Sequence, residues 1–149
     1  MMPRADTAIH RDVDAARRGD EPRVLARLGS GWAVFGSQQF VRGYLLLLPD
    51  PVVPQLNALA GAARAGFLAD MTRLGDALLQ VTDAVRINYA IFGNVEPALH
   101  AHVIPRYAHE PAAMRTAQPW AYDWSRAEPF DAAALAPLAE ALRQALRKL

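Results

Sequence analysis

The sequence predicts a single α+β domain: an antiparallel β-sheet, one long amphipathic helix packed on it, and a C-terminal helix. Three observations support this fold class. Two apolar runs of strand length, residues 32–37 and 44–50, flank a short polar connection. Residues 60–81 have the repeat of an amphipathic helix, and two strand-like runs, 85–93 and 98–107, follow it. A chain of 149 residues is long enough to bury the core of one domain.

The N-terminal part of the chain is a polar leader, residues 1–22, followed by the first elements of the sheet. Within the leader, residues 11–22 either form a short helix or are mobile, and RVLARL at 23–28 is a candidate short strand. The sequence QQFVRG at 38–43 predicts a hairpin between the two apolar runs. The second run, YLLLLPD at 44–50, is apolar almost throughout and is therefore expected to be a central strand.

A proline-containing connection and a helix follow this strand. Pro49, Pro51 and Pro54 are expected to exclude regular structure from the connection. Beyond it, apolar side chains recur at helical spacing over residues 60–81, with polar residues between them. The apolar stripe, which is expected to pack on the sheet, consists of Phe67, Met71, Leu74, Leu78 and Val81.

Residues 108–149 form a C-terminal extension. Its first part is expected to be irregular, and its second part predicts a helix over 137–149 with Pro137 in the first turn. One face of this helix is expected to carry Leu138, Leu142, Ala145 and Leu149. Trp120 and Trp124 either line a pocket, cover a partner or close the core, and the sequence does not rank these alternatives.

The composition excludes several classes of function. A net charge of +1, from 16 basic and 15 acidic residues, provides no electrostatic footprint for a nucleic-acid polymer. The absence of cysteine excludes disulfides, zinc–thiolate sites and thiol nucleophiles. The leader has no apolar core segment typical of a secretory signal, and no later apolar run is long enough to span a bilayer. We therefore expect a cytoplasmic protein that does not bind membranes.

His100 and His102 are separated by one residue in the last predicted strand. Alternate residues of a strand point to the same face, so both imidazoles and Ala98 are expected to share one face. Such a pair can ligate a metal, act as nucleophile and general acid on a phosphate, or be ordinary polar residues. A metal site needs a third ligand, and the other histidines are His10 in the leader and His109 just after the strand. No helix has a ligand spacing such as His-Glu-x-x-His, which disfavours the metal alternative.

The residues around the two histidines match a longer pattern. ALHAHVIPR, from residue 98, fits the frame His-x-His-x-His followed by two apolar residues and Pro-Arg, with Ala98 in the place of the first histidine. RGYLLLLPDPVVPQLNAL at 42–59 is similar to a strand and proline-containing loop before a long helix, and INYAIFGN at 87–94 to the strand before the motif. On these features residues 32–107, about half the chain, resemble the histidine triad (HIT) superfamily of nucleotide hydrolases and transferases.

The resemblance implies a mechanism with a nucleotidyl-histidine intermediate, carried here by two histidines. In the family the middle histidine attacks the α-phosphorus, which implies that His100 is the nucleophile. The other ring nitrogen of that histidine is expected to donate to the backbone carbonyl of the first motif residue, a bond that Ala98 retains. His102 is then expected to share charge with the phosphate or to protonate the leaving group.

Four further residues are candidates for substrate binding. By the same resemblance, Asn94 contacts the phosphate or ribose; alternatively it only forms the turn after Gly93. Arg106 is a candidate for a substrate contact or for a structural ion pair. Ser37 and Gln39 lie near the hairpin where family members contact the ribose, although polar residues are expected in a turn in any case.

The expected function is hydrolysis or nucleotidyl transfer at the α-phosphate of a purine nucleotide conjugate, such as a dinucleoside polyphosphate or a nucleoside phosphoramidate, without a cofactor. The alternative is a nucleotide-binding or regulatory protein in which loss of the first histidine has removed useful turnover. A metal-dependent hydrolase is a third possibility. The resemblance also implies a homodimer, and the apolar stretch at 85–92 is compatible with burial in its interface.

Overall fold

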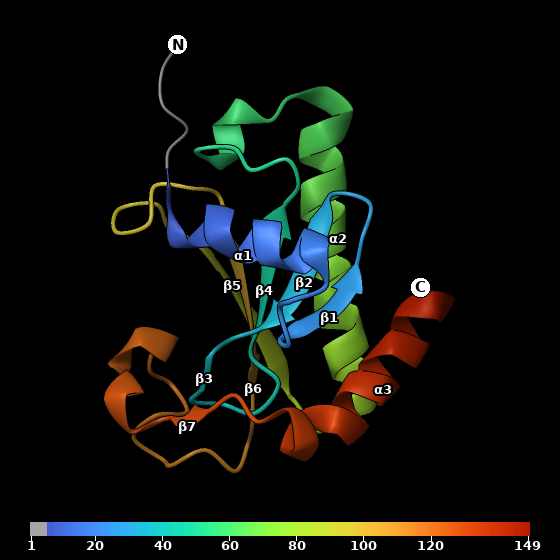
Figure 1. The fold of residues 1–149 in the computed structure, drawn as a ribbon. Helices are drawn as coiled ribbons and strands as arrows, with labels where there is room; N and C mark the ends of the chain where they lie inside the picture. The colour runs from blue at the N-terminus through green and yellow to red at the C-terminus, as the bar shows by residue number, and fades with distance from the viewer. Residues whose placement is uncertain (1–5) are drawn as a thin grey trace.

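A five-stranded antiparallel sheet forms the centre of the molecule (Figure 1). The computed structural model describes residues 6–149. The strand order is β1-β2-β4-β6-β5, and each neighbouring pair is antiparallel. The strands are β1 (Val24–Arg27), β2 (Gly31–Phe35), β4 (Leu45–Pro49), β5 (Arg86–Ile91) and β6 (Ala101–Arg106). The predicted α+β class and antiparallel sheet are confirmed.

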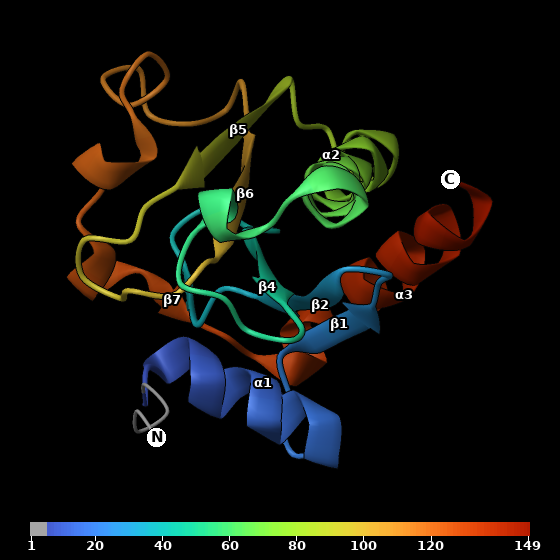
Figure 2. The ribbon, with the colours of Figure 1, turned by 90° about the horizontal axis from the view of Figure 1, so that it is seen from above.

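The apolar run at 44–50 forms the central strand, as its composition predicts. Helices cover the sheet on both faces, with α1 and α2 on opposite sides (Figure 2). Leu45, Leu47 and Leu48 of β4 are consequently completely buried. A strand that is apolar on both faces fits this position because each face meets another layer.

Helix α2 (Gly61–Val81) supplies the main apolar layer and agrees with the helix predicted over 60–81. Phe67, Leu74 and Leu78 are fully buried against the sheet and α3, while Met71 and Val81 pack at the margin. One polar residue of α2 is also buried. The carboxylate of Asp70 accepts hydrogen bonds from both the backbone N–H and the hydroxyl of Ser30, at 2.9 and 2.7 Å. Asp70 therefore ties α2 to the turn between β1 and β2.

Helix α1 (Ala8–Arg18) covers the opposite face (Figure 2). The sequence left open whether residues 11–22 form a short helix or are mobile, and the structure shows a helix over residues 11–18. Residues 1–5 of the leader lie outside the described part of the chain. The Thr7 side chain caps the helix by accepting from the N–H of His10 at 3.2 Å. The apolar contact of α1 with the sheet is made by Ile9, Val13, Val34, Leu48 and Ala98.

The C-terminal helix is longer than predicted. Helix α3 (Ala132–Lys148) begins five residues before Pro137, which lies inside it rather than in its first turn. The Asp131 side chain accepts from the N–H groups of Ala133 and Ala134, and this cap starts the helix ahead of the proline. Leu138, Leu142 and Ala145 are buried as expected. The prediction for Leu149 was wrong, because it follows the last turn and is 44% exposed.

Strand β6 also differs from its predicted limits. It begins at Ala101 rather than at residue 98, and Pro105 lies within it instead of closing it. The pairing of β6 with β4 ends at Val103, so Pro105 has a sheet neighbour only on the β5 side. A residue without an N–H is tolerated at such a position because no ladder bond to β4 is lost.

Three connections contain short regular elements that the sequence did not indicate. The predicted hairpin between β2 and β4 includes β3 (Gln38–Gln39), which pairs with β7 (Glu128–Pro129). The proline-containing connection has one 3₁₀ turn, η1 (Leu56–Ala58). The segment after β6 has two more, η2 (Pro119–Ala121) and η3 (Trp124–Arg126). No helix within residues 6–149 has the length and apolar composition needed to cross a bilayer.

Candidate active site

The two histidines of the motif lie side by side on the α1 face of the sheet. Their ring centroids are 5.1 Å apart, and the ring planes are 71° from each other. Ala98, on the same face, packs against α1, whereas Leu99 and Ala101 point to the α2 face. The alternation expected of a strand thus extends to His100, one residue before β6 begins.

The hydrogen bonding of His100 defines its tautomer. Its Nδ1 lies 2.8 Å from the backbone carbonyl oxygen of Ala98. A carbonyl oxygen only accepts, so Nδ1 must carry the proton. In the neutral ring Nε2 then holds the lone pair. This geometry is the one expected for a nucleophilic histidine oriented by the first residue of the motif.

His102 is held differently. Its Nδ1 lies 2.6 Å from the hydroxyl of Tyr44, a residue that is only 4% exposed. Burial, and to a smaller extent the charge that His100 can carry, lowers the pKa of His102 to about 4. His102 is therefore neutral at physiological pH, in contrast to a general acid that would be charged there.

A pocket of about 360 Å³ opens beside the two imidazoles. This volume lies within the range of small-ligand sites. Trp120 stands edge-on to His102, with ring centroids 5.0 Å apart. Phe92 lies next to both His102 and Trp120. The residues that line the pocket are Phe92, Asn94, Val95, Glu96, His100, His102, Gln118 and Trp120. Phe92, Val95 and Trp120 thus give the pocket apolar walls, and Asn94, Glu96 and Gln118 add polar groups beside the histidines.

Ala98 occupies a tightly filled position. It is completely buried, and its side chain packs with Ile9 and Val13 of α1. An imidazole at this position would overpack the contact between α1 and the sheet. The backbone carbonyl of Ala98, in contrast, remains available to orient His100.

The four substrate-binding candidates separate into two groups. Asn94 lines the pocket with the histidines, whereas the lining residues include none of the other three. Gln39 is 9% exposed, and its amide donates to the carbonyls of Gly36 and Tyr44 and accepts from the N–H of Gly43. Gln39 therefore holds the turn before β4. Ser37 is exposed, and its carbonyl accepts from the N–H of Phe130.

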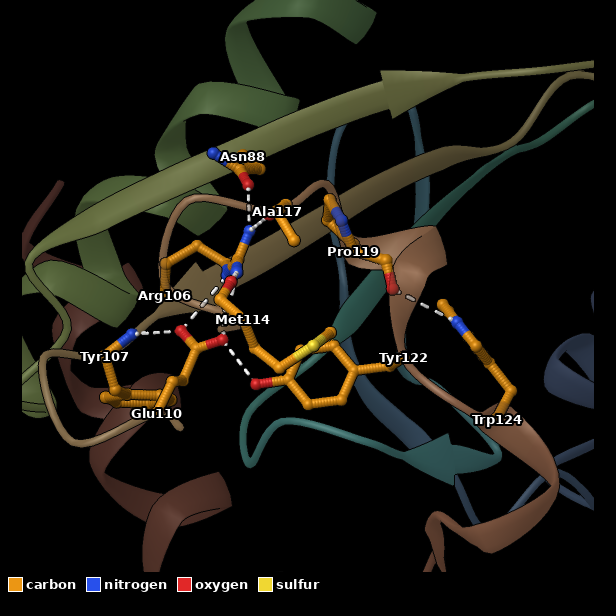
Figure 3. Close-up of polar contacts among 9 residues, drawn as sticks. All are labelled: Asn88, Arg106, Tyr107, Glu110, Met114, Ala117, Pro119, Tyr122 and Trp124. Carbon is orange, nitrogen blue, oxygen red and sulfur yellow. Dashed lines mark hydrogen bonds and ion pairs between the residues drawn. The ribbon is translucent and has the colours of Figure 1, made fainter. Parts of the chain in front are cut away.

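Arg106 forms a structural ion pair, which was one of its two predicted roles, and it is 6% exposed (Figure 3). Its guanidinium forms a buried ion pair with Glu110, at 3.0 Å. It also donates to the side chain of Asn88 at 2.9 Å and to the carbonyls of Met114 and Ala117 at 2.7 and 2.8 Å. Arg106 thus fastens the segment after β6 to the edge of the sheet.

Glu110 completes this network (Figure 3). Its carboxylate accepts from the Tyr107 N–H at 2.7 Å and from the Tyr122 hydroxyl at 2.6 Å. Burial opposes ionisation of Glu110, but the hydrogen bonds from Arg106, Tyr122 and Tyr107 outweigh it and lower the pKa of the carboxyl. The network fixes the segment that brings Gln118 and Trp120 to the pocket.

Sequence reasoning missed Tyr44, Phe92 and Gln118 as residues of the site, and it left Trp120 unassigned. Tyr44 precedes the central strand and is 58 positions from His102, so no local spacing connects them. Trp124 contributes indirectly, because it packs against Tyr44 with ring centroids 5.5 Å apart. Within residues 6–149, no group of three or more His, Asp or Glu side chains is arranged to hold a metal ion.

Comparison with known proteins identifies the fold. No protein-family model matches the sequence, and a search of curated proteins found no significant match. Solved structures do match. A histidine triad protein from Bradyrhizobium japonicum is 23% identical over 83% of this chain and 89% of its own, with a TM-score of 0.69. A hypothetical histidine triad nucleotide-binding protein from Sulfolobus tokodaii is 14% identical over 93% of each chain, with a TM-score of 0.72.

A zinc-bound histidine triad family protein from Mycobacterium smegmatis is also similar. It is 21% identical over 90% of this chain and 91% of its own, with a TM-score of 0.65. At these identities the similarity concerns the fold. The chain therefore has the fold of the histidine triad proteins.

Proposed function

We propose that the protein hydrolyses or transfers a nucleotidyl group at the α-phosphate of a purine nucleotide conjugate, with His100 as the nucleophile. One observation carries the proposal. The Nδ1–H of His100 is engaged by the Ala98 carbonyl, so Nε2 presents its lone pair in a pocket shared with His102. Phe92 and Trp120 add aromatic surface suited to a planar base.

The proposed reaction has two steps. Nε2 of His100 attacks the α-phosphorus, a P–N bond forms, and the bond from phosphorus to the leaving group breaks, with its electron pair departing on the leaving group. Water then attacks the phosphorus, the P–N electron pair returns to Nε2, and a nucleoside monophosphate and a proton are released. His102 donates a hydrogen bond to the oxygens on which charge develops. When an alcohol or amine replaces water, the same intermediate gives transfer.

The test is turnover and trapping of the intermediate in the wild-type chain. Diadenosine tetraphosphate and adenosine 5′-phosphoramidate are incubated with the protein in excess EDTA, and the reaction is stopped without acid. We expect product formation and a mass increase of one adenosine monophosphate on the peptide that contains His100. The Mycobacterium smegmatis structure is described as zinc-bound. Activity lost in EDTA and restored by zinc would therefore favour a metal-dependent hydrolase here.

A nucleotide-binding protein without useful turnover is the second candidate, because the first motif position holds a buried alanine instead of a histidine. Binding of AMP measured by calorimetry, without an adduct or product from any conjugate, would favour this candidate.

We further propose a homodimer that pairs through the edge of the sheet at β5. Val85, Tyr89 and Phe92 are 62%, 39% and 49% exposed, and the outer edge of β5 has no partner strand among the described residues. We expect sedimentation at micromolar concentration to give twice the monomer mass of 16.3 kDa. Val85→Lys should weaken the dimer, because a lysine directly before the first residue of the edge strand β5 opposes pairing there. Val95→Lys, in an exposed loop, is the matched control. A monomeric wild-type protein would contradict the prediction.

A further inference from the structure

The hydrogen bond between Tyr44 and His102 has a direction that the surroundings determine. Tyr44 immediately precedes β4, and its hydroxyl lies 2.6 Å from Nδ1 of His102. No second hydrogen-bond partner of this hydroxyl occurs among residues 6–149. If His102 were the donor, the buried hydroxyl hydrogen would have no acceptor, at a cost of roughly 1–3 kcal/mol. Tyr44 is therefore the donor, and Nδ1 of His102 is the acceptor.

The protonation state of His102 follows from this direction. A neutral imidazole that accepts at Nδ1 carries its hydrogen on Nε2. A charged imidazole would carry a hydrogen on Nδ1 as well and would donate it to the tyrosine oxygen, which leaves the buried hydroxyl hydrogen without an acceptor. Burial raises the pKa of Tyr44 well above its ordinary value, so the hydroxyl keeps its hydrogen. The tyrosine thus stabilises the neutral form of His102 and one of its two tautomers.

The position of Tyr44 is constrained by its neighbours. A side chain at Gly36 would overlap the tyrosine ring, since a Cβ there would lie 2.1 Å from it. Phe40 and Trp124 pack against the ring, with centroids 5.2 and 5.5 Å away. Gln39 holds the Tyr44 carbonyl at 2.9 Å. These contacts with Gly36, Phe40 and Trp124 therefore hold the hydroxyl of Tyr44 in place next to Nδ1 of His102.

We propose that Tyr44 is a positioning residue that holds His102 as a neutral Nε2–H donor, so that the site favours substrates whose leaving group departs as an anion. This inference rests on the proposed function. The two histidines then present complementary groups to the pocket, a lone pair on Nε2 of His100 and an N–H on Nε2 of His102. A neutral N–H stabilises an oxyanion but does not give up its proton near neutral pH.

The substrate class follows from this chemistry. The leaving group of a phosphoric anhydride is a phosphate, which is stable as an anion. An amine must instead acquire a proton before or as the P–N bond breaks, and neutral His102 does not supply one. The pocket is therefore suited to nucleoside polyphosphate conjugates. We expect turnover of diadenosine tetraphosphate to exceed that of adenosine 5′-phosphoramidate by at least about tenfold.

Nitrogen NMR of ¹⁵N-histidine-labelled protein between pH 6 and 8 tests the tautomer without any substrate. We expect Nε2 of His102 to be protonated and Nδ1 to be unprotonated, with the opposite pattern for His100. Tyr44→Phe should raise the fraction of His102 protonated on Nδ1. Tyr89→Phe, a change of the same type in the edge strand, should leave both histidines unchanged. Protonation of His102 at Nδ1 in the wild type, or an unchanged His102 pattern in Tyr44→Phe, would overturn the proposal.

A leaving-group series tests the chemical consequence. With adenosine 5′-phosphate esters of phenols of graded acidity, the wild-type rate of adduct formation should fall steeply as the phenol becomes less acidic. A flat dependence would mean that the leaving group is protonated as it departs, which overturns the proposal although the proposed function stands. Absence of turnover and adduct with every ester would overturn the proposed function and with it the preference for anionic leaving groups. The NMR experiment would still decide the role of Tyr44.

Discussion

Replacing His100 by asparagine is expected to remove both the covalent nucleotidyl adduct and turnover. Asparagine retains an amide N–H that can reach the Ala98 carbonyl, but it has no ring lone pair to attack phosphorus. Because the proposed nucleophile is deleted, we expect turnover to fall by more than about 10⁴-fold, or about 5.4 kcal/mol of barrier. The measurements are initial rates with diadenosine tetraphosphate and intact-protein mass after quenching without acid.

Two further histidine variants separate the roles. His102→Asn should slow turnover by roughly 10²- to 10³-fold, the cost of losing one hydrogen-bond donor to a developing oxyanion, but should retain some adduct because the bond-forming atom remains. His109→Asn should have no effect, because His109 is exposed and lies outside the pocket lining. An adduct on His102 or His109, or full activity of His100→Asn, would contradict the assignment of the nucleophile.

The sequence was most informative where a short pattern determines both structure and chemistry. The apolar run before Pro49 predicted the central strand because a strand buried on both faces needs apolar side chains on both. The spacing of His100 and His102 predicted adjacent imidazoles because alternation along a strand is local geometry. The bond from His100 to the Ala98 carbonyl was likewise expected, since it spans two residues.

Residues whose roles depend on distant contacts were not predicted. A substrate contact by Gln39 stays a prediction, but the sequence did not indicate that its amide holds the turn that presents Tyr44. Tyr44 itself was read only as the start of an apolar strand, because its partner His102 is remote in sequence. The early start of α3 depends on Asp131, a capping residue that sequence analysis overlooked in favour of Pro137.

The segment between β6 and α3 shows a second limit of sequence analysis. Its residues have neither helical nor strand periodicity, and its course depends on Arg106 and Glu110, which are both almost completely buried. A Pro-Arg pair at the end of a strand does not reveal whether the arginine points to a ligand or into the protein. The structure settles this by surrounding the guanidinium with acceptors from the segment itself (Figure 3).

Arg106→Met is therefore expected to be strongly destabilising. The variant leaves the Glu110 carboxylate buried without its cation, and two backbone carbonyls lose their donor. Removal of one partner of a buried ion pair typically costs about 3–5 kcal/mol of unfolding free energy. Urea unfolding at pH 7 gives this value. Arg126→Met, an exposed arginine of the same segment, should change it by less than about 0.5 kcal/mol.

Two additional measurements establish that the unpaired charge is the cause. In the double variant Arg106→Met with Glu110→Met, part of the loss should be recovered, because neither charge remains buried.

In the wild type the pKa of Glu110 is lowered, so its contribution to stability is present above the unfolded-state pKa and is lost as pH falls through the folded-state pKa. In Arg106→Met the unpaired carboxyl should instead have a raised pKa and take up a proton first. The difference in unfolding free energy between wild type and Arg106→Met should therefore shrink as pH falls from 7 to 4. A difference that stays constant over this range would show that the ion pair does not anchor the segment. A loss of unfolding free energy below about 1 kcal/mol at pH 7 would show the same.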